Sequence, residues 1–212
     1  MDLIKGLELI GLLIAAWVAI YGIDAWRREH AGKRKLELAE DTLAAFYEAA
    51  DAIRHIRSPA GYASEISEVI RGDRETEADF EARRNASVVL FRYNQHQELF
   101  NKLHAMRYRF MAQIGKKEAQ SFEDMRAIVN EILASAHILA RLWARDRHLT
   151  DIQLEQHRKR LDKFEAVFWE GLPEDDPINP KVAKIIAEVE LVCADVIAGQ
   201  GSLHSFLNRK VF

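Results

Sequence analysis

The first 26 residues of the chain contain an apolar segment whose length matches the hydrocarbon core of a membrane. No charged residue occurs from Leu9 to Ile23, and extending the segment back to Leu3 adds only Lys5 and Glu8. A helix of about 21 residues is roughly 31 Å long, which is close to the thickness of the apolar core of a bilayer. The sequence therefore predicts a single transmembrane helix, with residues 1–26 as the membrane anchor.

Two other kinds of protein can begin with a similar segment. A secretory signal peptide ends at a small-residue cleavage site, whereas this segment continues into Trp26, Arg27 and Arg28 without an Ala-x-Ala pattern. A buried helix of a soluble protein is the second alternative, because Glu8 and three glycines interrupt the apolar character. The pattern favours the membrane anchor over both.

Basic residues that follow the apolar segment predict which side of the membrane holds the rest of the chain. They are Arg27, Arg28, Lys33, Arg34 and Lys35. Only Lys5 and the terminal amine lie on the other side. Since basic flanks remain on the cytoplasmic side, we expect a single-pass protein with its C-terminal bulk in the cytoplasm. The same juxtamembrane residues would contact anionic headgroups, so membrane lipid is the first expected partner.

Small residues recur at every fourth position within the predicted span. Gly11, Ala15 and Ala19 form one stripe on a helix, and such a stripe allows two transmembrane helices to approach closely. A homodimer through the anchor is one hypothesis. The stripe can also face lipid or a different partner helix.

The remainder of the chain has helical periodicity, and no segment alternates with the period of a strand. The predicted helices cover residues 27–57, 79–113, 121–143, 150–171 and 179–199. The short connections between most neighbours favour antiparallel packing. The predicted fold class is all-α: the transmembrane helix, then a cytoplasmic antiparallel bundle of about five helices over 27–200, whose first helix is a long stalk (27–57). A C-terminal tail covers 201–212.

Several boundaries have recognisable signals. Pro59 and Gly61 end the first bundle helix, and Gly115 follows the second. Ser121, with Asp124 three residues later, predicts a capping box at the start of the third helix. Pro180 fits the first turn of the last helix. The acidic stretch from Ser64 to Arg84 is expected to be a solvated loop or a frayed helix start.

Metal binding is a candidate chemistry because bundles hold metal ions with carboxylates and histidines from facing helices. Glu48, Asp51 and His55 occupy one helical face, and other helices supply further histidines: His96, His104, His137 and His157. The alternative is an ordinary solvated face. No Glu-x-x-His motif occurs in the sequence, so no metal site or other cofactor is predicted.

A basic stretch without acidic residues runs from Leu99 to Lys117. Lys102, Arg109 and Lys116 are seven residues apart and are expected to share one face, which could bind the phosphates of anionic lipid or nucleic acid. The net charge of −3 argues against a protein that mainly coats nucleic acid. A neighbouring strip either lines a groove or packs in the core, and it contains Tyr93, Gln97, Phe100, His104 and Tyr108.

No catalytic residue is predicted, because the sequence has no phosphate-binding glycine loop, nucleophile elbow or Cys-x-x-Cys pair. Cys193 lies among valines and is expected to be a small buried residue. The favoured function is a non-enzymatic scaffold or protein-interaction module at the cytoplasmic face of a membrane, with a homodimer or another protein as partner. The alternatives are a ligand-binding or metal-binding enzyme, and a binder of anionic lipid or nucleic acid.

Overall fold

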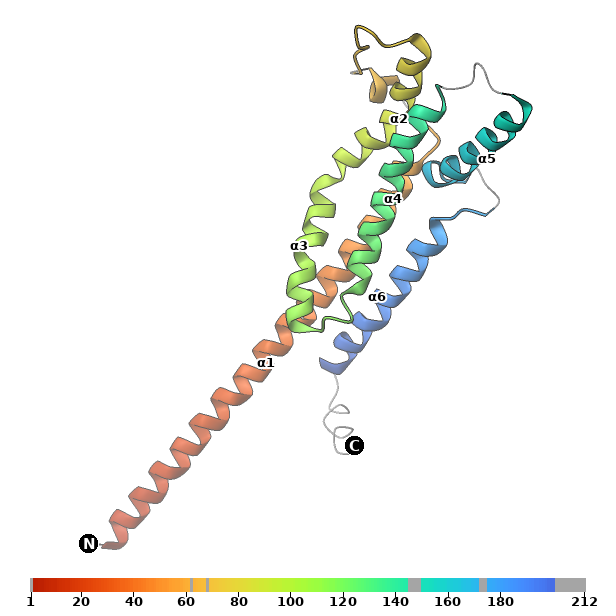
Figure 1. Cartoon of the computed structure of the whole chain (residues 1–212). Coiled ribbons are helices and arrows are strands. Elements are labelled where there is room, and N and C mark those ends of the chain that lie inside the picture. The colour runs from red at the N-terminus through yellow and green to blue at the C-terminus, as the bar shows by residue number, and fades with distance from the viewer. Residues whose placement is uncertain (1, 62, 68, 145–149, 172–174, 201–212) are drawn as a thin grey trace. The chain divides into compact units, whose positions relative to one another are not determined.

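A computed structural model of the chain describes all residues except 1, 62, 68, 145–149, 172–174 and 201–212 (Figure 1). The predicted C-terminal tail therefore lies outside the described residues. The described part contains six α-helices, one short 3-10 helix and no strand, which confirms the predicted all-α class. The elements are α1 (Asp2–Arg57), η1 (Ala63–Ile66), α2 (Glu77–Gln95), α3 (Gln97–Gln113), α4 (Gln120–Leu142), α5 (Asp151–Phe168) and α6 (Asn179–Gln200).

The chain forms two compact units, and helix α1 belongs to both. Unit 1 contains residues 1–41 and 193–212, and unit 2 contains residues 42–192. The division inside α1 falls between Asp41 and Thr42. The helix itself is continuous from Asp2 to Arg57.

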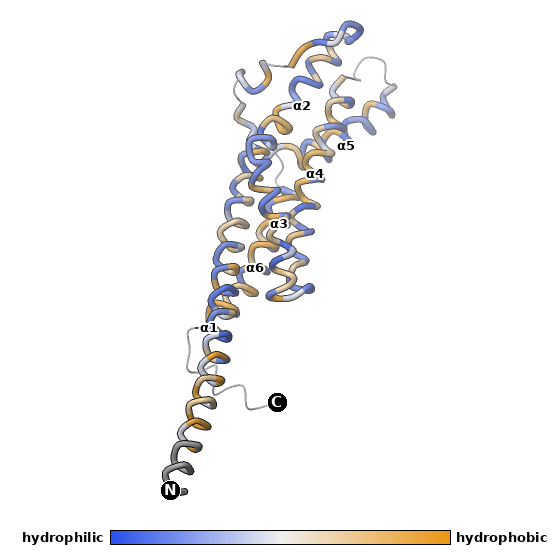
Figure 2. The backbone as a smooth tube through the Cα atoms, turned by 90° about the vertical axis from the view of Figure 1, so that its left-hand side faces the viewer, coloured by the Kyte–Doolittle hydropathy of each residue, from blue (hydrophilic) through white to orange (hydrophobic). Residues whose placement is uncertain are grey.

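In unit 1 the first described side chains of α1 are apolar and exposed. Ile10, Leu12 and Trp17 are 55%, 70% and 66% exposed, and the other large apolar residues up to Trp26 have similar values. Figure 2 shows the apolar colour of this part of α1. Among the described residues, this helix is long and apolar enough to cross a membrane, and none of its apolar window is buried.

Unit 2 has a packed helical core in which α4 contacts both α2 and α5. Met125, Ile132 and Leu139 on α4 are at most 1% exposed. The ring of Phe122 packs edge-on against Phe46 of α1, with ring centroids 4.9 Å apart, and it also contacts Phe110 of α3 at 5.2 Å. These contacts form a helical bundle, because each helix buries its apolar stripe against its neighbours.

The helix boundaries agree with some sequence signals and correct others. α1 ends at Arg57, as Pro59 and Gly61 predict, and α6 begins at Asn179 with Pro180 in its first turn. The predicted second helix is two helices, because His96 leaves helical geometry with φ −104° and ψ 7°. Its N–H donates to the carbonyl of Tyr93 at 3.0 Å, and this bond closes a tight turn between α2 and α3.

The capping box predicted at Ser121 is wrong. α4 begins one residue earlier, at Gln120, its N-cap is Ala119, and no side-chain hydrogen bond caps it. Ser121 is instead buried at 6% exposure. At the start of α6, the carboxylate of Asp176 provides the cap by accepting hydrogen bonds from the N–H groups of Ile178 and Asn179. The stretch from 64 to 84 was predicted to be a solvated loop or a frayed helix start, and its described residues include η1 and the beginning of α2.

Arg57, the last residue of α1, is fully buried and joins three helices of unit 2. Its guanidinium donates to the carbonyl oxygens of residues 166, 167 and 169 at the end of α5, at 2.8–3.0 Å. It also donates to Asn179 Oδ1 at 3.1 Å and to Asp176 Oδ2 at 2.9 Å, at the start of α6. Because the last carbonyls of a helix have no partner within the helix, this arginine satisfies groups that would otherwise be buried unpaired.

Arg92 of α2 has the same role at the end of α1. It is 1% exposed and forms a two-pronged ion pair with Glu65 of η1, at 2.8 and 2.9 Å. Its Nη atoms donate to the carbonyl oxygens of His55, Ser58 and Ala60. Arg92 therefore fixes the chain reversal that follows α1.

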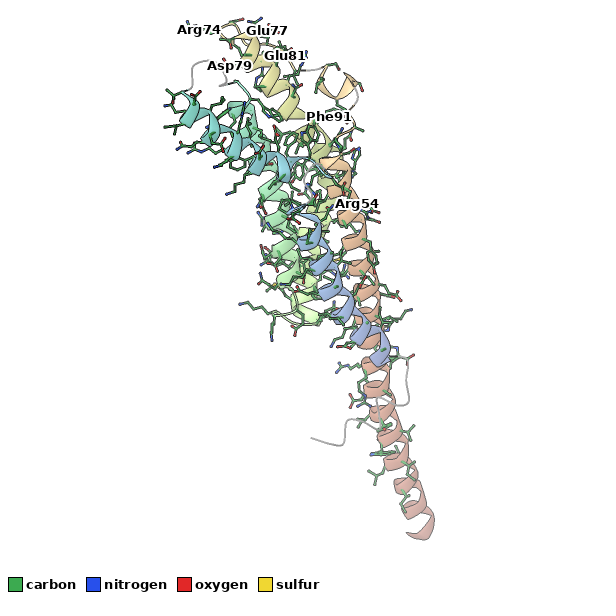
Figure 3. All side chains as sticks on the ribbon, turned by 90° about the vertical axis from the view of Figure 1, so that its right-hand side faces the viewer. Arg54, Arg74, Glu77, Asp79, Glu81 and Phe91 are labelled. Carbon is green, nitrogen blue, oxygen red and sulfur yellow. The ribbon has the colours of Figure 1, made fainter. Side chains whose placement is uncertain are left out.

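We predict that Arg57→Ala lowers the free energy of unfolding by about 3 kcal/mol or more. The substitution leaves the Asp176 carboxylate and the buried carbonyls without their charged donor, and removing one partner of a buried pair typically has a cost of this size. Chemical denaturation followed by circular dichroism measures the change. Arg54→Ala is the matched control, since Arg54 on the same helix is exposed and pairs with the exposed Asp51 (Figure 3). A similar loss in both variants would contradict this account.

Candidate functional site

The structure places the predicted metal face on the outside of α1. Glu48, Asp51 and His55 are all exposed. The carboxylate of Asp51 accepts a hydrogen bond from Arg54 at 2.5 Å. In the part of the chain that the structure describes, no three residues of the His, Cys, Asp and Glu types are grouped so that they could hold a metal ion. The three predicted residues are therefore not brought together as a ligand set.

His55 instead contacts His96, which lies 41 positions later in the chain. His55 Nδ1 and His96 Nε2 are 2.9 Å apart, and the rings meet edge to face with centroids 5.2 Å apart and planes at 80°. The contact connects the last turns of α1 to the junction between α2 and α3. In a neutral pair of this kind, one nitrogen donates and the other accepts, so the contact requires complementary tautomers.

Burial lowers the pKa of His96 from its usual value, and the nearby His55 lowers it further. His96 is half-buried, whereas His55 is exposed. Both effects disfavour the charged imidazolium, because it loses hydration and would face a second positive charge. His96 therefore keeps a neutral imidazole, with one nitrogen lone pair, to a lower pH than a free histidine does.

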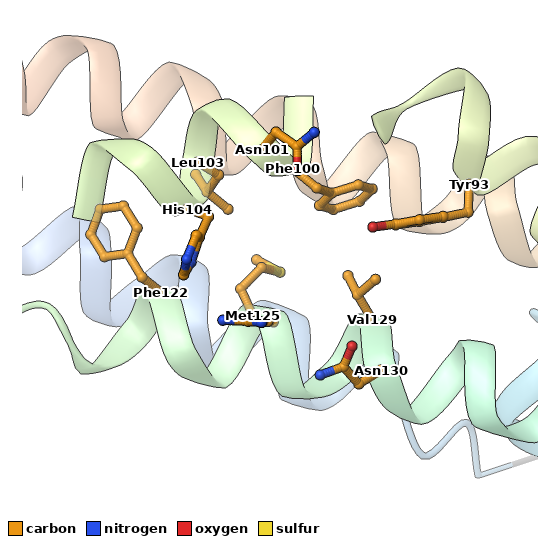
Figure 4. Close-up of a pocket in the computed structure, with 10 residues that line it drawn as sticks. Tyr93, Phe100, Asn101, Leu103, His104, Phe122, Met125, Val129 and Asn130 are labelled. Atoms are coloured by element: carbon orange, nitrogen blue, oxygen red, sulfur yellow. The ribbon is translucent and has the colours of Figure 1, made fainter. Parts of the chain in front are cut away.

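A small cavity lies between α3 and α4 in unit 2 (Figure 4). Its volume is about 180 Å³, comparable to a cavity that holds one benzene ring. The rings of Tyr93 and Phe100 stack on one side at 5.6 Å between centroids. The remaining lining is partly apolar and partly polar: Asn101, Leu103, His104, Phe122, Met125, Arg126, Val129 and Asn130. The predicted strip thus contributes Tyr93, Phe100 and His104 to a cavity rather than to the core alone.

The predicted basic face is only partly helical. Lys102 and Arg109 are exposed on α3, but α3 ends at Gln113, so Lys116 lies in the turn that follows. Arg107, on the same helix, forms an ion pair with Glu123 of α4. The seven-residue spacing therefore defines a helical face for Lys102 and Arg109 alone.

The residues predicted to contact the membrane lie along α1 in unit 1. Gly11, Ala15 and Ala19 are exposed, so the small-residue stripe is uncovered in this chain. The juxtamembrane basic residues are exposed as well: Arg27, Arg28, Lys33, Arg34 and Lys35. Lys33 lies 4.0 Å from Glu37, one turn further along the helix. Dimerisation through the stripe and contact with anionic lipid remain predictions.

Cys193 is fully buried. Burial raises the pKa of its thiol to about 11, because a thiolate would lose its hydration. The thiol is therefore protonated at neutral pH and is a poor nucleophile. This matches the small buried residue that its valine neighbours in sequence predict.

Comparisons with protein-family models, curated proteins and solved structures found no match to this chain. Geometry alone therefore distinguishes the candidate sites. Two features of unit 2 bring together residues that are far apart in the sequence and able to bind a ligand. They are the His55–His96 pair and the cavity between α3 and α4.

We predict that the free energy of unfolding falls as the pH decreases through about 6.5, and that His96 contributes to this fall. The unfolded chain binds a proton on His96 near pH 6.5, whereas the folded chain does so only at lower pH because the folded pKa is depressed. The stabilising contribution is therefore complete above about pH 7 and decreases below it. Urea unfolding at a series of pH values, in the presence of EDTA, measures the slope.

His96→Gln should flatten this pH dependence, because glutamine does not titrate. His137→Gln is the matched control, since His137 is an exposed histidine on α4. An unchanged slope in His96→Gln would show that His96 does not couple folding to protonation.

Proposed function

We propose that the protein is a single-pass membrane protein whose helical bundle is an interaction module at the cytoplasmic face of the membrane. The observation that carries the proposal is the exposure of every large apolar side chain described from Ile10 to Trp26. Soluble monomers rarely expose a continuous apolar surface of this extent. Burying each large apolar side chain is worth about 1.5–3 kcal/mol, so the segment is strongly favoured to leave water.

The distribution of these side chains around the helix supports lipid rather than a protein groove. Leu12, Leu13 and Ile14 are consecutive and are 70%, 64% and 58% exposed. Successive residues of an α-helix are about 100° apart, so three in a row cover much of its circumference. A partner helix or groove would cover one face of such a helix, whereas a bilayer surrounds it.

The end of the apolar segment has the features of a membrane–water boundary. Trp26 stacks on His30 with ring centroids 5.1 Å apart, and the exposed Tyr21 lies five residues before Trp26. Tryptophan and tyrosine favour the interface, and the exposed basic residues from Arg27 to Lys35 would then lie among the headgroups. The excess of basic residues on this side supports a cytoplasmic location for the bundle.

The proposed role of the bundle is to bind a second copy of the chain or another protein close to the membrane. Its buried arginine contacts fix helix ends and so favour a defined surface. The basic residues of α3 and the cavity between α3 and α4 support the alternatives, binding of anionic lipid and of a small ligand. In both alternatives the bundle is still anchored in the membrane, but it binds lipid or a small ligand instead of a protein.

We expect the full-length protein to sediment with membranes, to resist extraction with alkaline carbonate and to dissolve in detergent. The double variant Leu13→Arg/Val18→Arg should move mostly to the soluble or carbonate-extracted fraction, because each arginine at the centre of a span costs about 2.5–3.5 kcal/mol. Fractionation followed by immunoblotting measures the distribution.

The matched control is Ile152→Arg/Leu191→Arg, which places the same charges at positions of unit 2 that are 74% and 71% exposed. It should sediment like the wild type. Recovery of the wild-type protein in the supernatant without detergent would contradict the anchor. An equal distribution of the two double variants between membrane and soluble fractions would also contradict the anchor.

Chemical crosslinking in native membranes tests the interaction role separately. We expect one discrete crosslinked product, and its mass distinguishes a homodimer from a complex with a different protein. Monomer alone at every crosslinker concentration, with no protein that purifies together with the chain, would contradict the interaction role while leaving the anchor intact.

A further inference from the structure

We propose that the cavity between α3 and α4 is a binding site for a small monocyclic aromatic carboxylate. Its volume is about 180 Å³, and an apolar cavity of roughly 150 Å³ is enough to bind benzene. The end of α2, α3 and α4 all contribute to its lining. The site goes beyond the proposed interaction role and does not depend on the membrane anchor, since its lining residues belong to unit 2.

One side of the cavity is an aromatic wall. Tyr93 precedes the helix break at His96 and Phe100 follows it, and the two rings stack with planes 20° apart and centroids 5.6 Å apart. Figure 4 shows this wall facing Met125 and Val129 of α4 across the cavity. A further ring stacks favourably at such centroid distances, and a methionine sulfur contacts ring edges favourably. The cavity therefore favours a flat aromatic ring.

The inner lining of the cavity is apolar, whereas its outer lining is polar. Buried side chains form the inner lining, and they include Leu103, Met125 and Val129. The polar lining residues that are exposed to solvent are Asn101, Arg126 and Asn130. Ligand sites commonly combine an apolar pocket with a few polar groups that fix the orientation of the ligand. A matching ligand has an apolar ring with a polar group at one end.

Arg126 gives the polar side of the cavity a positive charge. None of the described lining residues is an aspartate or a glutamate. The acidic residues that precede Arg126 on α4 have other partners, since Glu123 pairs with Arg107 and Asp124 accepts a hydrogen bond from Gln120. A guanidinium matches a carboxylate with two parallel hydrogen bonds, and such charge-assisted bonds are stronger than neutral ones. The polar group that fits this site is therefore a carboxylate.

Fluorine NMR of the full-length, detergent-purified chain tests the site with 4-fluorobenzoate as the probe. 4-Fluorobenzamide has the same ring without the charge, and detergent micelles without protein are the blank. We expect 4-fluorobenzoate to bind with a dissociation constant of about 0.1–1 mM, which is within the range of ligands of this size. The neutral amide should bind about fivefold more weakly or worse, because it forms no ion pair with Arg126.

Arg126→Gln should weaken the binding of 4-fluorobenzoate about tenfold or more, and should change the binding of 4-fluorobenzamide less than about twofold. The matched control is Arg109→Gln, which removes an exposed arginine of α3 outside the lining and should leave both affinities unchanged. Phe100→Leu should weaken both probes about threefold or more, because it removes one ring of the wall. The exposed position of Arg126 keeps the test valid if Phe100→Leu proves unstable.

Three results would overturn the proposal. The first is the absence of 4-fluorobenzoate binding above the micelle blank at concentrations up to about 10 mM, far above the affinity expected. The second is equal affinity for the two probes, which would remove the preference for a carboxylate. The third is equal binding of 4-fluorobenzoate by the wild type and Arg126→Gln, which would place the carboxylate on other residues. All three leave the membrane anchor intact, because the fractionation experiment tests it separately.

Discussion

The apolar surface of α1 between Ile10 and Trp26 is the strongest physical constraint on this chain. Its large side chains are more than half exposed, on all sides of the helix. Exposing such an apolar surface to water is unfavourable. A bilayer removes this surface from water at little cost, because the helix satisfies its own backbone hydrogen bonds. The same continuous helix also supplies the first helix of the bundle core, from Thr42 to Arg57. A membrane-spanning segment at its start would therefore be joined to the bundle by unbroken helix.

Two buried arginines determine how the end of that helix is held in unit 2. Arg57 reaches the last carbonyls of α5 and the Asp176 cap of α6, and Arg92 reaches the carbonyls that follow α1. Burying a guanidinium has a high desolvation cost, so these contacts do not simply add stability. They do make alternative helix arrangements unfavourable, because any other arrangement leaves a charged group and several carbonyls unpaired.

Local signals predicted much of the fold, since periodicity and helix-breaking residues act over a few positions. The all-α class, the end of α1 at Arg57 and the start of α6 at Asn179 are confirmed. The break at His96 was missed because its neighbours include neither proline nor glycine, and tertiary packing determines the turn. Ser121 resembles a cap in sequence, but α4 begins one residue earlier and buries its side chain.

The site residues were harder to predict, because they depend on contacts between distant segments. His55 was identified within a metal face, yet its actual partner is His96 rather than Asp51. Arg57 and Arg92 had no signal at all, since charged residues are rarely placed in a core and their acceptors are backbone carbonyls. The strip from Tyr93 to Tyr108 was assigned either to a groove or to the core, and three of its five residues, Tyr93, Phe100 and His104, line the cavity. The cavity itself depends on the packing of α4 against this strip, which the sequence does not show.

Spin labels in reconstituted vesicles test the central claim most directly. Single cysteines at Ile14, Val18, His30 and Ile152, in a Cys193→Ala background, carry the label. The account predicts that labels at Ile14 and Val18 are relaxed more strongly by oxygen than by a water-soluble chromium complex. Labels at His30 and Ile152 should show the reverse. Strong relaxation by the chromium complex at Ile14 and Val18 would mean that the segment lies in water, and it would contradict the membrane anchor.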